Sequence, residues 1–231
     1  MSAAPIHIAG ERLMLDPAGV LFWPAQRMLV VADLHLEKGS SFAARGHGLL
    51  PPYDTRETLL HLGNALRRYR PERLVALGDS FHDATGHTRL AEQDAAALRH
   101  MLSGVAVTWV LGNHDPVAPA SLPGEACAEL REGPLVFRHQ ALPGKQPPGE
   151  LSGHFHPKGS MPTRCGPVTR PCFMTDPRRA ILPAFGAYTG GLAATDPALA
   201  NLFPWGARLF LLGKERLFSL PMAPARRLTT A

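Results

Sequence analysis

Carboxylate, imidazole and amide side chains follow short apolar runs at several points along this sequence. The group contains three oxygen donors and four imidazoles: Asp33, His35, Asp79, Asn113, His139, His154 and His156. Two pairs within it are separated by a single residue, and in an extended segment such neighbours point to the same face. Two such pairs facing the Asp79 carboxylate could hold two cations, with that carboxylate bridging them. The residue types and their spacing therefore indicate a dinuclear metal site.

The apolar runs before these side chains predict buried strands. Residues 74–77 run into Gly78 and Asp79, and a short apolar run bounded by glycine is typical of a strand. Runs of the same form lie at 28–32, 105–111, 135–137 and 151–153. Open α/β sheets bind their ligands at the carboxyl ends of the strands. We therefore expect these strand ends to meet at one edge and to present the candidate ligands there.

Apolar residues at helical spacing separate the first three of these strands. They predict one helix from Asp54, which we expect to cap it, to just before Pro71, and a second over 90–103 that stops at Gly104. This strand–helix order predicts parallel strands joined by right-handed crossovers. Residues 37–52 are interrupted by glycine, serine and proline, and are predicted to form a loop over the metal-binding edge.

The second half of the chain has a different character. Beyond His114 the helical periodicity fades, and glycine and proline interrupt the sequence often. Short strands are predicted there at 172–175, 180–183, 209–212 and 216–220, in addition to those near the N-terminus at 6–8, 11–15 and 20–23. We therefore expect a mostly β layer packed against the first half.

Length and composition narrow the class of protein. The 231 residues fit one domain over 1–231, with 222–231 as a frayed tail, and 45% apolar with 19% charged residues excludes broad disorder. We find no signal-peptide profile, no apolar run of membrane-spanning length and no CxxC pair among the three cysteines, so we expect a reduced, cytoplasmic compartment and no membrane partner. The net charge of +5 favours anionic substrates, phosphate in particular.

Five blocks of the sequence resemble those of the calcineurin-like metallophosphoesterases, in the same order over residues 30–157. They are Asp33-Leu34-His35, Gly78-Asp79, Gly112-Asn113-His114-Asp115, His139 and Gly153-His154-Phe155-His156. Two further stretches resemble the DNA-ligase-associated subgroup of the bacterial phosphoesterases: 33–46 (DLHLEKGSSFAARG) and 181–192 (ILPAFGAYTGGL). The resemblance implies an α/β fold, an α/β/β/α sandwich of two mixed sheets with a dinuclear metal site at the carboxyl ends of the strands. It gives no role to 181–192.

The resemblance also implies which residues bind which ion. Asp33, His35 and His156 hold one metal; Asn113, His139 and His154 hold the other; and Asp79 bridges them. Two divalent cations about 3.5–4 Å apart polarise a phosphoryl group and convert a bound water to hydroxide near neutral pH. Mixed nitrogen and oxygen ligation without thiolate suits Mn²⁺, Fe or Zn²⁺, and three oxygen ligands favour Mn²⁺. We therefore expect a dinuclear-metal-dependent phosphodiesterase that uses metal-activated hydroxide.

His114 adjoins a metal ligand in the sequence but lies outside the ligand set. It is placed to protonate the leaving oxygen or to stabilise its charge, and Asp115 could orient its ring. A structural hydrogen bond is the alternative role for His114.

One block departs from the broader family. Many members read Gly-Asp-x-x-Asp-Arg, whereas this chain has His82 at the fifth position and Asp83 at the sixth. In phosphomonoesterases of that kind the arginine grips a dianionic phosphate, so its absence favours a singly charged diester. His82 could contact the substrate, support a metal ligand from behind, or simply pack. Arg164 and Arg170, in the loop after His156, are candidate substrate contacts.

Other functions compete with phosphodiester hydrolysis. A metal-dependent nuclease acting on DNA is the enzyme alternative, and a non-catalytic scaffold for DNA ligase is the other; an intact ligand set disfavours the scaffold. The subgroup resemblance implies association with DNA ligase and helicase, whereas basic charge alone leaves direct nucleic-acid binding open. Gly78-Asp79-Ser80 also resembles a block of serine esterases, but those need a late histidine to activate the serine, and none follows His156.

Overall fold

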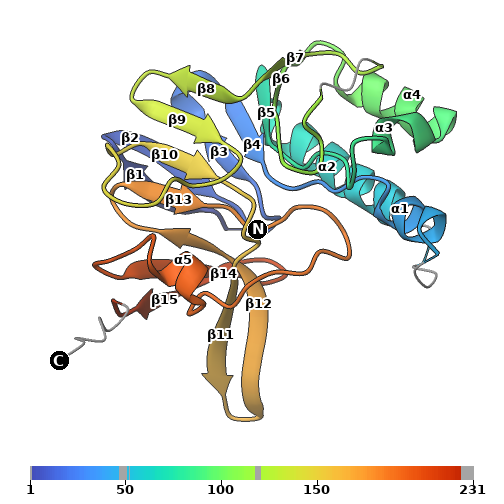
Figure 1. Ribbon diagram of the computed structural model, residues 1–231. Helices are drawn as coiled ribbons and strands as arrows, with labels where there is room; N and C mark the ends of the chain where they lie inside the picture. The colour runs from blue at the N-terminus through green and yellow to red at the C-terminus, as the bar shows by residue number, and fades with distance from the viewer. Residues whose placement is uncertain (1, 47–50, 52, 118–120, 225–231) are drawn as a thin grey trace.

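Two β-sheets pack face to face in the computed structural model, with helices on the outside (Figure 1). The structure describes residues 2–46, 51, 53–117 and 121–224. The first sheet has the order β1 to β7: β1 (Ala4–Ile8), β2 (Glu11–Leu15), β3 (Leu21–Trp23), β4 (Met28–Val31), β5 (Arg73–Leu77), β6 (Ala106–Val110) and β7 (Glu125–Cys127). The second sheet has the order β15-β14-β12-β13-β10-β9-β8, and β11 pairs with β12.

The strands of the second sheet are β8 (Glu129–Glu132), β9 (Leu135–Arg138), β10 (Glu150–Ser152), β11 (Lys158–Thr163), β12 (Gly166–Thr175), β13 (Arg179–Ile181), β14 (Ala207–Leu212) and β15 (Leu217–Met222). The helices are η1 (Pro24–Gln26), α1 (Lys38–Ala44), α2 (Asp54–Tyr69), α3 (Gly86–Arg89), α4 (Glu92–Met101) and α5 (Pro197–Ala200). Both sheets are mixed, because β4 to β7 run parallel in the first and β9, β10 and β13 run parallel in the second.

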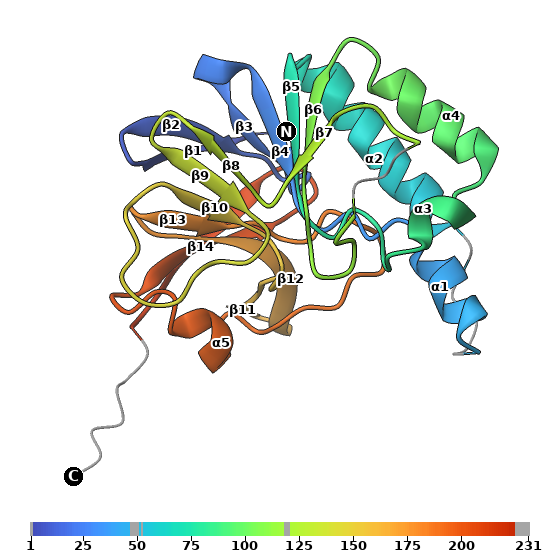
Figure 2. The same cartoon turned by 45° about the horizontal axis from the view of Figure 1, so that its top comes forward.

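The apolar side chains of the strands alternate between the two faces of each sheet and so form separate layers of the hydrophobic core. Val30 of β4 belongs to the buried apolar cluster between the sheets, together with Phe137 and Leu151 of the second sheet. Its neighbour Val31 points the other way and joins the cluster beneath α2 and α4, because successive side chains of a strand alternate between faces. On the outer face of the second sheet, a third cluster includes Leu199 of α5. The expected α/β/β/α sandwich is confirmed (Figure 2).

The prediction of a loop over 37–52 is wrong for Lys38–Ala44, which forms α1. Glycine and serine disfavour helix, so the sequence of this segment did not predict α1. Gly39 packs closely there, because a Cβ atom on it would lie 2.9 Å from Asp54 Oδ1 and would displace that carboxylate. Asp54 is also not the cap of α2: it is the first helical residue, and its Oδ2 accepts a hydrogen bond from Gly39 N at 3.0 Å. Residues 47–50 and 52 lie outside the described residues.

Sequence patterns missed the hairpin of β11 and the first half of β12. It projects from the body of the protein, and its residues are mostly exposed (Figure 1). Without a buried face there is no apolar alternation to detect. Of the expected tail, residues 225–231 lie outside the described part. None of the described helices combines the length and the apolar character needed to cross a membrane.

Candidate metal centre

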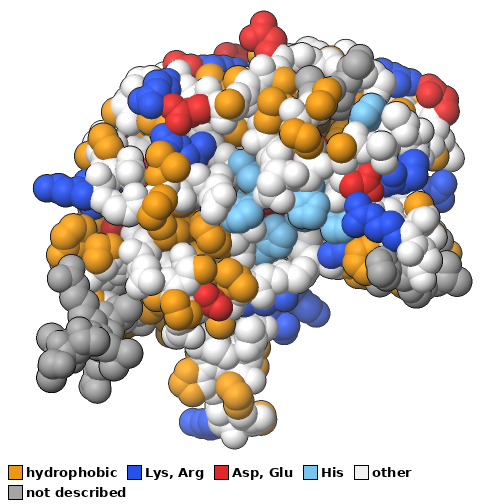
Figure 3. Space-filling model, in the orientation of Figure 1, with side chains coloured by type: hydrophobic (Ala, Val, Ile, Leu, Met, Phe, Trp, Pro, Cys, Tyr) orange, Lys and Arg blue, Asp and Glu red, His pale blue; other side chains and the backbone are white. Residues whose placement is uncertain are grey.

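The seven candidate ligands come together at the carboxyl ends of five strands. Each lies within a few residues of the end of its strand: Asp33 and His35 follow β4, Asp79 follows β5, Asn113 follows β6, His139 follows β9, and His154 and His156 follow β10. Six of them form two groups whose donor atoms lie within 4.8 Å of one another: a first cluster of Asp33, His35 and His156, and a second cluster of Asp79, His139 and His154. Histidines gather on this face of the molecule, with lysine and arginine side chains beside them (Figure 3).

Asp79 belongs to the second cluster and also approaches the first. Its Oδ2 is 3.9 Å from His35 Nε2 in the first cluster and 3.4 Å from His139 Nε2 in the second. Its other oxygen, Oδ1, accepts a hydrogen bond from His114 N at 2.9 Å, which fixes the orientation of the carboxylate. The carboxylate therefore has the position required of a bridging ligand.

Asn113 belongs with the second cluster. Its Oδ1 is 2.9 Å from His139 Nε2, and that nitrogen is 3.0 Å from His154 Nδ1. Burial opposes protonation of His139, but its contacts with Asp79 and Asp33 outweigh burial and raise its pKa to about 9. The carboxylates thus stabilise a positive charge at this point, which is the electrostatic requirement of a cation site.

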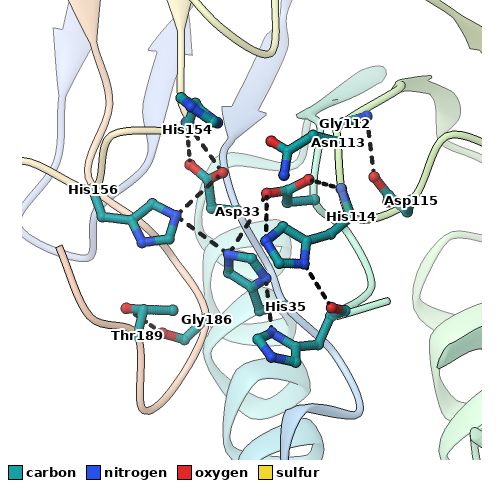
Figure 4. Close-up of polar contacts among 12 residues, drawn as sticks. Asp33, His35, Gly112, Asn113, His114, Asp115, His154, His156, Gly186 and Thr189 are labelled. Carbon is teal, nitrogen blue, oxygen red and sulfur yellow. Dashed lines mark hydrogen bonds and ion pairs between the residues drawn. The ribbon is translucent and has the colours of Figure 1, made fainter. Parts of the chain in front are cut away.

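Two members of the first cluster, Asp33 and His35, are buried, and the imidazoles of His35 and His156 face each other. His35 Nε2 lies 3.3 Å from His156 Nε2, and His156 Nε2 lies 3.4 Å from Asp33 Oδ1 (Figure 4). Burial and the nearby His156 lower the pKa of His35, so its ring is neutral. Neutral imidazole nitrogens converging on a carboxylate form a donor set that suits a divalent ion. The residues present therefore fit two such ions, one in each cluster.

The backbone that carries the ligands is left-handed at five of the seven positions. The φ angles are 54°, 44°, 46°, 71° and 47° at Asp33, His35, Asp79, His154 and His156. The prediction that the paired ligands lie on extended segments is therefore wrong. Left-handed backbone costs a non-glycine residue about 1–2 kcal/mol, and such strain collects at functional sites.

Glycines give the ligand side chains room. A Cβ atom on Gly78 would lie 2.3 Å from His139 Nδ1, and one on Gly153 would lie 2.4 Å from Asp33 Oδ2. Both distances are far below contact, so any larger residue would displace a ligand. The sequence blocks showed these glycines beside the ligands but not this reason for them.

Residues 181–192, which the sequence left without a role, brace both ligand loops of the first cluster. Gly186 N donates a hydrogen bond to Asp33 O at 3.0 Å, and Leu192 N donates to Phe155 O at 3.3 Å. A Cβ atom on Gly191 would lie 2.1 Å from His156 O. Glycines permit this close approach of two backbones. They were the feature of the stretch from which such a contact could have been predicted.

His114 lies at the mouth of the site. Its Nδ1 is 2.8 Å from the carbonyl oxygen of His82, and since a carbonyl can only accept, Nδ1 carries the proton. Its Nε2 lies 3.9 Å from Asp79 Oδ2, and the side chain is 39% exposed. The exchangeable nitrogen therefore faces both the clusters and solvent.

The prediction that Asp115 orients the His114 ring is wrong. Asp115 Oδ2 accepts hydrogen bonds from the backbone amides of Ser80 at 2.7 Å and Phe81 at 3.2 Å, and Oδ1 accepts one from Gly112 at 3.1 Å. Asp115 is buried, and its side chain ties the loops after β5 and β6 to each other. The His82 carbonyl takes the role expected of Asp115.

The candidate substrate contacts fall in different places. His82 lies against the site, where burial and the nearby Lys38 ammonium lower its pKa to about 4. Arg164 lies at the tip of the β11–β12 hairpin, and Arg170 on β12 lies opposite Gly159. No contact between these two arginines and the clusters is present among the described residues. Sequence reasoning did not single out Lys38, the ammonium group beside His82. Its Nζ donates a hydrogen bond to Tyr188 O at 2.8 Å.

Comparison with known proteins places this fold and site in a class. The calcineurin-like phosphoesterase family model matches residues 26–165, so the chain belongs to that family. With its histidine and aspartate clusters intact, the protein is a metal-dependent phosphoesterase. No curated protein matches the chain.

The solved structures similar to it include the following two. Nuclease MPE from Pseudomonas putida is 29% identical, with a TM-score of 0.74, over 94% of this chain and 100% of that one. Yfce, a phosphoesterase from E. coli, is 12% identical, with a TM-score of 0.42, over 84% of this chain and 98% of that one.

Proposed function

We propose that this phosphoesterase hydrolyses phosphodiester bonds, and that the seven residues gathered at the strand ends bind two divalent ions, Mn²⁺ by preference. The observation that carries the diester proposal is that Asp83, which stands where many members of the family have the phosphate-gripping arginine, is paired with two arginines. Arg89 forms two hydrogen bonds to Asp83, at 2.7 and 3.1 Å, and Arg45 lies 3.6 Å from the same carboxylate. Asp83 therefore holds the Arg89 guanidinium in a bidentate pair and forms a looser ion pair with Arg45. A dianionic monoester would need an uncommitted arginine fork, whereas a singly charged diester does not.

Divalent ions bound at such a site activate water and neutralise charge on the phosphoryl oxygens. The protein's own groups do the rest. The Asp79 carboxylate, held by His114 N, faces both clusters with one oxygen. When doubly protonated, His114 gives the proton on Nε2 to the leaving oxygen. The proton on Nδ1 stays in its hydrogen bond to the His82 carbonyl.

The diester proposal is tested with two nitrophenyl substrates. We expect the Mn²⁺-loaded protein to hydrolyse bis(p-nitrophenyl) phosphate faster than p-nitrophenyl phosphate at equal metal content. A faster monoester would contradict the proposal, and would show that another group grips the dianion, with Arg164 and Arg170 the first candidates.

We further propose a nucleic acid as the diester substrate. The similarity to a nuclease over the full length of that protein supports this, as does the basic net charge of +5. The test is incubation with single-stranded, double-stranded and nicked DNA in Mn²⁺. We expect cutting that the Asp79→Asn variant lacks; hydrolysis of the nitrophenyl diester without any DNA cutting would restrict the function to small diesters. Association with DNA ligase or helicase stays a prediction of the subgroup resemblance.

A further inference from the structure

His82 is held tightly beside the first cluster. Its backbone N–H donates a hydrogen bond to the carbonyl oxygen of Leu36 at 2.9 Å, and Leu36 is the residue after His35 in the chain. Its ring stacks on His114, with centroids 5.2 Å apart and planes 22° apart, and it lies 5.6 Å from the Phe42 ring of α1. In this position its Nδ1 lies 3.3 Å from Nδ1 of His35. The ring is therefore confined between a neighbouring helix and two site residues.

Two ring nitrogens that face each other form a hydrogen bond only when one of them carries a proton. The opposite nitrogen of His35, Nε2, points into the first cluster, 3.3 Å from His156 Nε2. A neutral imidazole that binds a cation through Nε2 must carry its proton on Nδ1. His35 is then the donor of this hydrogen bond and His82 Nδ1 the acceptor, with the proton of His82 on its own Nε2.

In the second cluster, too, a hydrogen-bond acceptor holds the outer ring nitrogen of a ligand histidine. His139 Nδ1 lies 3.0 Å from the carbonyl oxygen of Leu77, so that a main-chain acceptor fixes the ring and leaves Nε2 for the cluster. Ligating histidines commonly donate their second ring N–H to such an acceptor, and loss of that partner weakens metal binding. For His35 the corresponding acceptor belongs to a side chain, which a substitution can remove.

We infer that His82 is a positioning residue of the metal centre, whose Nδ1 accepts the Nδ1–H of His35 and thereby holds Nε2 of His35 toward the first cluster. The inference rests on the metal site proposed above. The main-chain carbonyl of the same residue accepts from His114, so a change of side chain removes the acceptor of His35 but leaves the hydrogen bond that fixes the His114 ring in place. His82 therefore acts through His35 rather than on the substrate.

The test compares two side chains of opposite character at one position. His82→Phe keeps an aromatic ring to stack on His114 but has no acceptor, whereas His82→Asn places an amide oxygen close to the position of Nδ1. Mn²⁺ binding is measured by calorimetry and by electron paramagnetic resonance of the unbound ion. We expect His82→Phe to weaken one of two Mn²⁺ sites about 10- to 100-fold and to leave the other unchanged, and His82→Asn to stay within a few-fold of the parent. His61→Phe, an exposed change on α2, is the matched control and should bind as the parent does.

The outcomes separate the possible roles. If both variants bind two Mn²⁺ ions as the parent does but raise KM for the diester, His82 contacts the substrate and the inference is wrong. Equal weakening by Phe and Asn would also overturn it, because an acceptor would then not matter. Should the phenylalanine variant fail to fold, His82→Ala takes its place and must show the loss that His82→Asn does not. Two Mn²⁺ ions bound by a parent protein that cleaves no diester would refute the proposed function and leave this inference standing.

Discussion

Replacement of Gly78 by alanine tests whether packing against the backbone holds the ligand histidines. Gly78 has φ of +72° and precedes Asp79, and a Cβ atom there would lie 2.3 Å from Nδ1 and 2.5 Å from Cγ of His139. His139 is 7% exposed and its Nδ1 is hydrogen-bonded to Leu77 O. Its ring therefore cannot move aside without losing that bond or its place in the second cluster.

Two costs add in this variant. The left-handed backbone costs an alanine about 1–2 kcal/mol, and forcing a methyl group into a packed site costs typically about 1–3 kcal/mol. A substitution at Gly104 measures the backbone cost alone, because this glycine has φ of +80° but nothing within 4 Å of the position that a Cβ atom would take. Gly104→Ala should therefore lose only the first amount, and Gly78→Ala about 2–5 kcal/mol in all.

The assay is urea unfolding of both variants in EDTA, followed by Mn²⁺ titration of the folded proteins. We expect Gly78→Ala to be less stable than Gly104→Ala by about 1–3 kcal/mol and to bind Mn²⁺ more weakly at one site, while Gly104→Ala binds both ions normally. Equal stability losses, or undisturbed Mn²⁺ binding by Gly78→Ala, would refute the reasoning.

Three further predictions concern single side chains. Asp79→Asn should lower Mn²⁺ content at both sites, because one oxygen faces both clusters; elemental analysis after dialysis measures this, and two retained ions with normal activity would exclude bridging. His114→Ala should lose about 10²–10⁴-fold on an alkyl or nucleoside diester but much less on the nitrophenyl diester, with unchanged metal content, because nitrophenolate leaves without a proton; equal losses would return His114 to a structural role. Asp16→Ala should cost about 1–3 kcal/mol in urea unfolding, because the buried carboxylate accepts from Tyr69 and pairs with Arg68, yet should leave Mn²⁺ affinity unchanged.

The strands and the identity of the clustered residues were readable from the sequence because both depend on short-range patterns. Apolar runs ending in Asp79 or His139 marked the strands, and the carboxyl ends of parallel strands meet at one edge. Nothing comparable marked the left-handed backbone at Asp33, since residue type does not set φ for aspartate. The extended geometry expected of the paired ligands was wrong for that reason.

The supporting contacts were not predictable because they join segments far apart in the chain. Gly186 meets Asp33 across more than a hundred residues, and no periodicity encodes that contact. Asp115 illustrates the converse, because its neighbour in the sequence, His114, is not its partner in space. Proximity along the chain located the candidate site but could not assign its hydrogen bonds.

Each cluster takes its ligands from both sheets, and this has a consequence for how the protein assembles. The first cluster joins Asp33 and His35, after β4, to His156, after β10; the second joins Asp79, after β5, to histidines after β9 and β10. Neither sheet alone holds a complete set, so both must form and dock before an ion can bind. Ions that bind only the docked state stabilise it by mass action. A metal pair held there would link the two sheets, and its removal should lower the stability of the docked state more than that of either sheet.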